Sequence, residues 1–132
     1  MPSEAPTAAG GPLVGRSVLI VEDEAPIALH LAAAIQRAGT TVIGPAATVG
    51  QAHAVMADNR IDGTLLDIRL HNETSFPLAD VLAVLGVPFV FVSGLSSALM
   101  PYPHRERPLF DKPYETEAVI DALARLIDQR AT

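Results

Sequence analysis

Residues 17–26 have the sequence SVLIVEDEAP, in which an apolar run is followed directly by three acidic residues and then a proline. A continuous run of branched apolar residues is typical of a parallel strand that is buried on both faces. Pro26 suits the first turn of a helix, because the N–H that it lacks would have no partner there. We therefore expect a buried strand that ends in carboxylates and leads straight into a helix.

Short apolar runs continue to alternate with helix-period segments along the chain. Further strands are expected at 41–43, 62–66, 89–92 and near 109–111. Expected helix starts are Pro26, Thr48, and Thr74 or Ser75, while an apolar stripe from Val119 to Ile127 marks the last helix. Gly39 is expected to end the first helix, and Gly44-Pro45 the second strand. This alternation predicts an α/β fold with one doubly wound, five-stranded parallel sheet.

The interval 94-GLSSALMPYPHRERP-108 departs from that alternation, because its prolines stand at 101, 103 and 108. Helical potential is confined to residues 95–100, which is less than two turns, and so short a helix is marginal by itself. Proline also disfavours helical conformation in the residue before it. We therefore expect a short or irregular fourth helix, with residues 95–107 forming a short or mobile element.

Composition limits the chain to a single globular domain. It has 132 residues, of which 49% are hydrophobic and 18% are charged. The first fifteen residues lack the pattern of a secretory signal, so we expect a flexible tail over 1–15 and one domain over 16–130. No apolar run is long enough to span a membrane. With no cysteine, disulfides and thiolate metal sites are excluded, which fits a cytoplasmic location.

The net charge of −6, from 9 basic and 15 acidic residues, disfavours direct binding of nucleic acid. Polar side chains instead gather at the carboxyl ends of the expected strands, where ligands of open α/β sheets bind. They are Glu22, Asp23 and Glu24 after the first strand, Asp67 after the third, Ser93 after the fourth and Lys112 after the fifth. Each has an ordinary explanation as a cap or turn residue, but their joint placement predicts a site. Carboxylates this close need a cation, and Mg²⁺ suits oxygen ligands.

Four motifs at these strand ends resemble the receiver domain of two-component response regulators, which has a flavodoxin-like (βα)5 fold. They are 21-VEDE-24, 65-LLDIRL-70, 91-FVSG-94 and 111-DKPY-114. The resemblance covers roughly residues 17–129, and its strength lies in the order and spacing of the motifs. It implies a phosphoprotein that takes part in phosphorelay signal transduction.

The resemblance assigns the metal and phosphoacceptor roles residue by residue. It implies that Asp67 becomes a phosphoaspartate. Asp23 and Asp67 would bind Mg²⁺ directly with the backbone carbonyl of Arg69, and Glu22 would act through a water molecule. Glu22 departs modestly from the family, which often has Asp at this position. Phosphoryl transfer needs mainly in-line positioning and cations that neutralise oxygen charge, and this set supplies both.

The resemblance also assigns the phosphoryl-binding residues. Ser93 would donate a hydrogen bond to one phosphoryl oxygen and Lys112 would pair with another, with a cis peptide common in the family before Pro113. Most receivers carry an aromatic switch residue three positions before the lysine. Here that position is Leu109, and we interpret the neighbouring Phe110 as a strand residue that faces one side of the sheet.

A subgroup of stand-alone receivers with a Phe-Ala-Thr-Gly-apolar-Tyr motif is partly matched by 91-FVSGLS-96. Since the chain begins with Met1 and stops just after the last helix, we expect a single-domain response regulator without an output domain. It would be a monomer or weak homodimer and not an enzyme. Its phosphoryl donor would be a sensor histidine kinase or histidine phosphotransfer protein. It would act on a downstream protein target or as a phosphate shuttle or sink.

Two alternatives remain open from the sequence. The first is a receiver-like module that binds partners without being phosphorylated, which the intact acidic set disfavours. The second is a small Mg²⁺-dependent phosphatase with an aspartyl nucleophile. Such enzymes typically have a DxD motif at the first strand end, whereas Asp23 is followed here by Glu24-Ala25.

Overall fold

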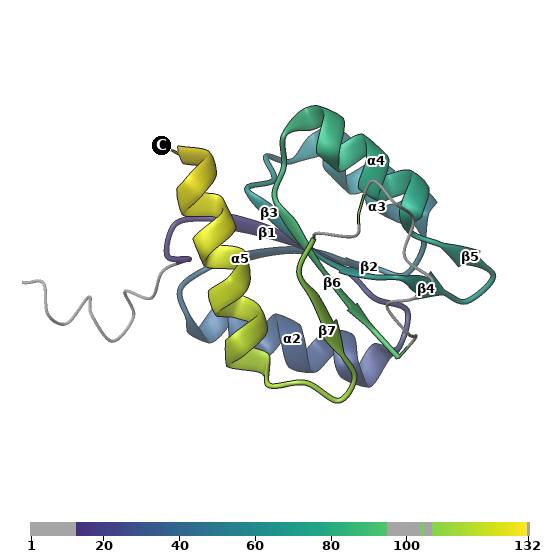
Figure 1. Ribbon diagram of the computed structural model, residues 1–132, viewed down its shortest axis with the longest axis horizontal. Coiled ribbons are helices and arrows are strands. Elements are labelled where there is room, and N and C mark those ends of the chain that lie inside the picture. The colour runs from purple at the N-terminus through teal and green to yellow at the C-terminus, as the bar shows by residue number, and fades with distance from the viewer. Residues whose placement is uncertain (1–12, 95–103, 105–106, 132) are drawn as a thin grey trace, which may run out of the picture.

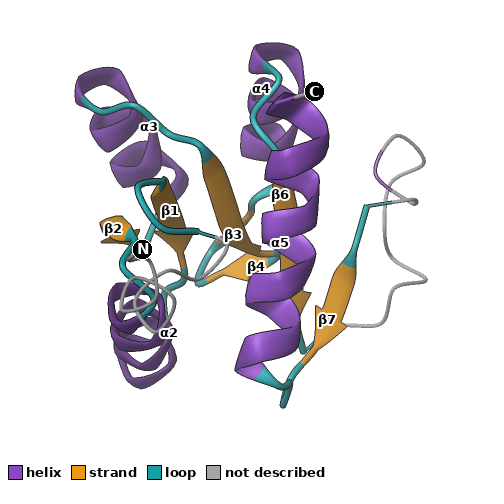
Figure 2. Cartoon of the chain, turned by 90° about the vertical axis from the view of Figure 1, so that its left-hand side faces the viewer, coloured by secondary structure: helices purple, strands orange, loops and turns teal. Residues whose placement is uncertain are grey.

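A five-stranded parallel sheet forms the centre of the computed structural model, which describes residues 13–94, 104 and 107–131. Its strands are β1 (Ser17–Val21), β2 (Thr41–Ala46), β3 (Gly63–Asp67), β6 (Phe89–Ser93) and β7 (Leu109–Asp111). Their order in space is β2-β1-β3-β6-β7, so β2 and β7 form the two edges (Figure 2). The predicted doubly wound α/β fold is confirmed.

Four helices of the described residues cover the two faces of the sheet. They are α2 (Ala25–Arg37), α3 (Val49–Asp58), α4 (Phe76–Leu85) and α5 (Thr116–Ala131). Figure 1 shows α2 and α5 on one side and α3 and α4 on the other. Successive residues of β1 pack on opposite faces of the sheet, because the side chains of a strand alternate in direction. Val18 and Ile20 pack in the core under α2 and α5, whereas Leu19 and Val21 pack in the core under α3 and α4.

The helix ends follow the predicted signals in part. Thr48 caps α3, since its hydroxyl accepts the backbone N–H of Gln51 at 3.0 Å. The cap of α4 is Ser75 and not Thr74, which lies in a strand, and the Ser75 side chain makes no capping hydrogen bond. Gly86 ends α4 with a φ of +74°, a conformation that costs glycine little.

Two stretches near the sheet differ from the sequence prediction. Strand β2 does not stop at Ile43 but runs through Gly44-Pro45 to Ala46, with a shift in its register to β1. Gly44 makes this possible, because its φ is +94° and a Cβ there would lie 2.8 Å from a backbone nitrogen. After β3, a two-stranded antiparallel hairpin forms from β4 (Arg69–Leu70) and β5 (Glu73–Thr74), which the sequence pattern did not predict.

The boundaries of the predicted tail and of the fourth helix fall largely on residues that are not described. Residues 1–12 lie outside the described part, but Leu13, inside the predicted tail of 1–15, is fully buried in the core under α2 and α5. Of residues 95–107, only His104 and Arg107 are described. His104 is buried against three phenylalanine rings, and its Nε2 lies 2.8 Å from Asp80 Oδ1.

No helix among the described residues is both long and apolar enough to cross a membrane.

Candidate functional site

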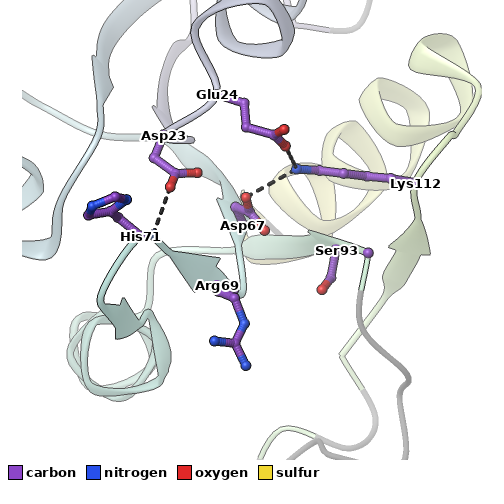
Figure 3. Close-up of a pocket in the computed structure, with 8 residues that line it drawn as sticks. Asp23, Glu24, Asp67, Arg69, His71, Ser93 and Lys112 are labelled. Atoms are coloured by element: carbon purple, nitrogen blue, oxygen red, sulfur yellow. Dashed lines mark hydrogen bonds and ion pairs between the residues drawn. The ribbon is translucent and has the colours of Figure 1, made fainter.

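Acidic and basic side chains meet in a pocket at the carboxyl edge of the sheet, as the sequence predicts. The pocket has a volume of about 410 Å³ (Figure 3). Asp67 ends β3, Ser93 ends β6, and Lys112 follows β7, so three neighbouring strands deliver these side chains to one place. The residues that line the pocket are Asp23, Glu24, Asp67, Arg69, His71, Ser93, Gly94 and Lys112.

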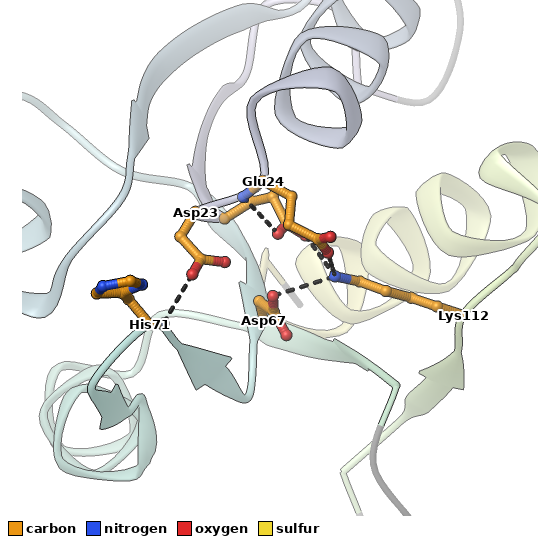
Figure 4. A network of polar contacts seen from close by, with 6 residues as sticks. Asp23, Glu24, Asp67, His71 and Lys112 are labelled. Carbon is orange, nitrogen blue, oxygen red and sulfur yellow. Dashed lines mark hydrogen bonds and ion pairs between the residues drawn. The ribbon is translucent and has the colours of Figure 1, made fainter.

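The Lys112 ammonium is the centre of the polar network. It lies 3.0 Å from Glu24 Oε1, 3.1 Å from Asp67 Oδ2 and 3.0 Å from Glu22 Oε1 (Figure 4). Partial burial lowers the pKa of Lys112, but its contacts with Glu24 and Glu22 raise the pKa more, so the net direction is upward. Lys112 therefore stays charged and holds the carboxylates together.

Glu22 is buried beneath this network. Its residue exposure is 2%, and its Oε2 accepts the backbone N–H of Glu24 at 3.1 Å. Its Oε1 lies 3.0 Å from the Lys112 ammonium, which Glu22 shares with Glu24 and Asp67. A buried carboxylate that shares a single ammonium with two other carboxylates is costly, so a divalent cation would stabilise it.

The pKa of Asp67 is raised from 3.8 to about 7, first by burial and then by the negative charge of Glu22, while Lys112 opposes the rise. Carboxylate oxygens of Glu22, Glu24 and Asp67 lie within 4.8 Å of one another. One ammonium does not neutralise three such groups, and this set of oxygen donors fits a hard divalent cation such as Mg²⁺. The donors that the structure brings together thus agree with the predicted cofactor.

Asp23 and Arg69, two of the predicted metal ligands, line the same pocket from its other side. Asp23 Oδ2 accepts the backbone N–H of His71 at 2.7 Å, which ties the end of β1 to the β4–β5 hairpin (Figure 4). His71 has a φ of +41°. The grouping of three close carboxylates contains Glu24 in place of Asp23, so metal binding by Asp23 stays a prediction.

Ser93 and Leu109, the predicted switch positions, differ in their surroundings. Ser93 is fully buried and lines the pocket. Leu109 is half-buried and packs toward α3 and α4, whereas Phe110 packs toward α2 and α5, which confirms its interpretation as a strand residue. The peptide bond between Lys112 and Pro113 is cis.

Glu73 and Tyr114 were not predicted as site residues from the sequence, and Glu24 was placed at the site without an assigned role. Glu24 belongs to the acidic triplet, so its position was a signal. Glu73 Oε2 accepts the backbone N–H of Val49 at 2.9 Å, a contact between the hairpin and α3 that no motif indicates. Tyr114 lines a second pocket of about 550 Å³ with Glu24 and Lys112, and its hydroxyl oxygen is buried.

Solved structures of other proteins resemble this chain. No protein-family model matches the chain. The solution structure of SdrG from Sphingomonas melonis Fr1 is 38% identical, with a TM-score of 0.73, over 85% of this chain and 96% of that one. A response regulator receiver domain protein (CheY-like) from Methanospirillum hungatei JF-1 is 21% identical, with a TM-score of 0.78, over 88% of this chain and 96% of that one.

A curated relative is the phyllosphere-induced regulator PhyR of Methylorubrum extorquens. It is 31% identical over 83% of this chain and 43% of its own length. The chain spans less than half the length of the curated relatives that it matches.

Proposed function

Because this chain belongs to the response regulator receiver family of two-component systems, we propose that Asp67 accepts a phosphoryl group from a histidine kinase or a histidine phosphotransfer protein. The observation that carries the proposal is the contact of Asp67 Oδ2 with Lys112 Nζ at 3.1 Å inside the acidic pocket. A nucleophilic carboxylate beside a fixed cation is what phosphoryl transfer requires of a protein.

In the proposed step, a carboxylate oxygen of Asp67 attacks the phosphorus of a phosphohistidine. A phosphorus–oxygen bond forms, the phosphorus–nitrogen bond breaks, and the imidazole leaves with the electron pair and takes up a proton. Lys112 compensates negative charge on the transferred oxygens, and the Ser93 hydroxyl donates a hydrogen bond to one of them. Receiver domains are generally not enzymes in their own right, and Asp67 is both nucleophile and product in this step.

Asp23, Asp67 and the backbone carbonyl of Arg69 would hold Mg²⁺, with Glu22 contributing through water. The ion supplies neutralisation of charge on the phosphoryl oxygens. Two observations support this assignment, because both reflect an excess of negative charge: the buried Glu22 carboxylate shares one ammonium with Glu24 and Asp67, and the pKa of Asp67 is raised. Glu24 forms an ion pair with Lys112 and would help to hold the ammonium in the pocket.

The proposed unit of function is a receiver domain over residues 16–130 that signals through contact with another protein or passes its phosphoryl group on. The likeness to SdrG over 96% of that chain supports a receiver domain as this unit. A phosphate sink that drains a kinase uses the same chemistry and the same residues. All three outputs depend on phosphorylation of Asp67.

Intact mass after incubation with Mg²⁺ and acetyl phosphate tests the proposal. We expect one phosphoryl group on the wild-type chain and none on Asp67→Asn. Asp111→Asn, an exposed aspartate beside Lys112 outside the pocket lining, is the matched control and should be labelled. No uptake from acetyl phosphate or a cognate kinase would instead favour a binding module, and rapid multiple turnover would favour a phosphatase.

A further inference from the structure

A basic pocket lies at the end of the sheet opposite to the proposed phosphorylation site. It has a volume of about 280 Å³ and is lined by Arg16, Arg60 and Arg130, together with Ile61, Asp62 and Ile127. The three arginines come from the residue before β1, the connection between α3 and β3, and the last turn of α5, so no run of the sequence indicates that they meet. Guanidinium groups that share one pocket repel one another unless an anion joins them.

Contacts within the fold hold the three elements of this pocket together. Strands β1 and β3 are parallel neighbours, and the backbone N–H of Asp62 donates to the carbonyl of Ser17 at 2.8 Å. The last turns of α5 pack against the start of β3, since a Cβ at Gly63 would lie 2.8 Å from Ile127 Cδ1. Arg130 follows Ile127 by three residues and therefore lies on the same face of α5. The arginines thus belong to a fixed part of the domain.

Asp62 fixes one of the arginines and leaves the other two without a counter-charge. It is buried, and among the described residues it is the only acidic one that lines the pocket. Its Oδ2 accepts the backbone N–H of Ser17 at 2.8 Å, and its Oδ1 accepts Nε of Arg60 at 3.0 Å. The side chains of Arg16 and Arg130 have no hydrogen bond or ion pair within the part of the chain that the structure describes. Three positive charges and one negative charge leave an excess of two positive charges.

These features fit a small anion that carries a phosphate group. Guanidinium groups present planar sets of N–H donors that match phosphate oxygens, and they stay charged at every physiological pH. A phosphate group carries about two negative charges at pH 8, which balances the excess positive charge. Ligand pockets usually start at about 300 Å³, so this one suits a phosphate group better than a nucleotide. We propose that Arg16, Arg60 and Arg130 bind the phosphate group of a small molecule, either inorganic phosphate or a phosphomonoester.

The phosphate site is separate from the phosphoacceptor. Asp62 precedes β3 and Asp67 ends it, so the two positions are roughly 16 Å apart along an extended strand. A phosphate bound by the arginines therefore does not compete with a phosphoryl group on Asp67, and it stabilises the folded domain because it binds only the assembled pocket. The phosphate site does not depend on phosphorylation of Asp67, so its absence would leave the proposed function intact.

Titration of the metal-free protein with sodium phosphate at pH 8, followed by amide NMR, tests the site. The amide signals of Arg16, Arg60 and Arg130 should move and saturate at millimolar phosphate, while those of Asp67 and Lys112 stay in place. No saturable movement, or movement that sodium chloride of the same ionic strength reproduces, would overturn the proposal. Glycerol phosphate distinguishes the two sources, because tighter binding than that of inorganic phosphate assigns a phosphomonoester and weaker binding assigns inorganic phosphate.

Charge-removing variants then test the arginines themselves. Arg16→Gln and Arg130→Gln should each raise the dissociation constant for phosphate about tenfold or more, because each removes a charged donor. Arg125→Gln, which removes an exposed arginine of α5 outside the pocket lining, is the matched control and should bind as the wild type does. Equal weakening in all three variants would overturn the proposal, by making the attraction a property of the overall charge. Thermal denaturation without phosphate checks that each variant is folded.

Discussion

Replacement of Asp67 by asparagine should stabilise the metal-free protein at pH 8. Asp67 is 4% exposed and shares its surroundings with the buried Glu22, so its ionised form is disfavoured in the folded state. The substitution keeps the size of the side chain and removes the charge. Ionisation of this buried carboxylate lowers the free energy of unfolding when no divalent cation is bound. The substitution should restore that amount of stability.

The size of the gain follows from the two pKa values. The pKa is 3.8 ordinarily and about 7 in the folded protein. At about 1.4 kcal/mol per pH unit, the upper limit is about 4 kcal/mol. Solvent at the open pocket screens the charges, so we expect about 1–2 kcal/mol. The folded state binds the proton more tightly, so the cost is absent below about pH 4, grows between pH 4 and 7, and is complete above pH 7.

Urea denaturation of both proteins at pH 4, 6 and 8, in the presence of a chelator, measures this difference. The free energy of unfolding of Asp67→Asn should exceed that of the wild type at pH 8, and the excess should vanish toward pH 4. Asp121→Asn, an exposed aspartate in α5, should show no such trend with pH. An excess that is constant with pH, or a wild type that is more stable at pH 8, would contradict the electrostatic reasoning.

Three further predictions concern the site and the backbone around it. Lys112→Gln should lower the melting temperature of the metal-free protein, because three carboxylates lose their shared cation, and Mg²⁺ should recover part of the loss in a thermal scan. Gly44→Ala should lower the free energy of unfolding, measured in urea, by about 2–4 kcal/mol. Gly86→Ala should lower it by about 1 kcal/mol, because Gly86 has a similar positive φ but no atom within 4 Å of the new Cβ. Equal losses for the two variants would contradict the predicted clash at Gly44. Thr48→Ala should lower the free energy of unfolding in urea by about 1 kcal/mol, because it removes the hydroxyl that caps α3. Thr48→Ser retains this hydroxyl and should lose less stability.

Local patterns were sufficient to predict the sheet and the convergence of the site. The apolar runs that form β1, β3 and β6 are buried along nearly their whole length, and such runs predict central parallel strands. Once those strands are parallel neighbours, the residues that follow them must meet at one edge. Asp67 and Lys112 could therefore be placed together from sequence alone, although 45 residues separate them.

The remaining features depend on contacts that a linear pattern does not contain. The hairpin after β3 needs His71 at a positive φ and an acceptor on Asp23, which is 48 residues away. The close approach of Glu24 to Lys112 spans 88 residues and depends on how α2 starts. The predicted end of β2 was wrong, because Gly44-Pro45, which usually signals a turn, continues an edge strand here.

The two edge strands of the described sheet also limit how another chain could join it. Strand β2 contains Pro45, which has no N–H to offer, and a register shift disturbs its pairing close to that residue. Strand β7 is only three residues long. Proline, irregular pairing and short length are the features that discourage a further strand from adding to a sheet. Partners of this protein are therefore expected to recognise its side-chain surfaces, and the sheet itself is protected from growth into edge-to-edge aggregates.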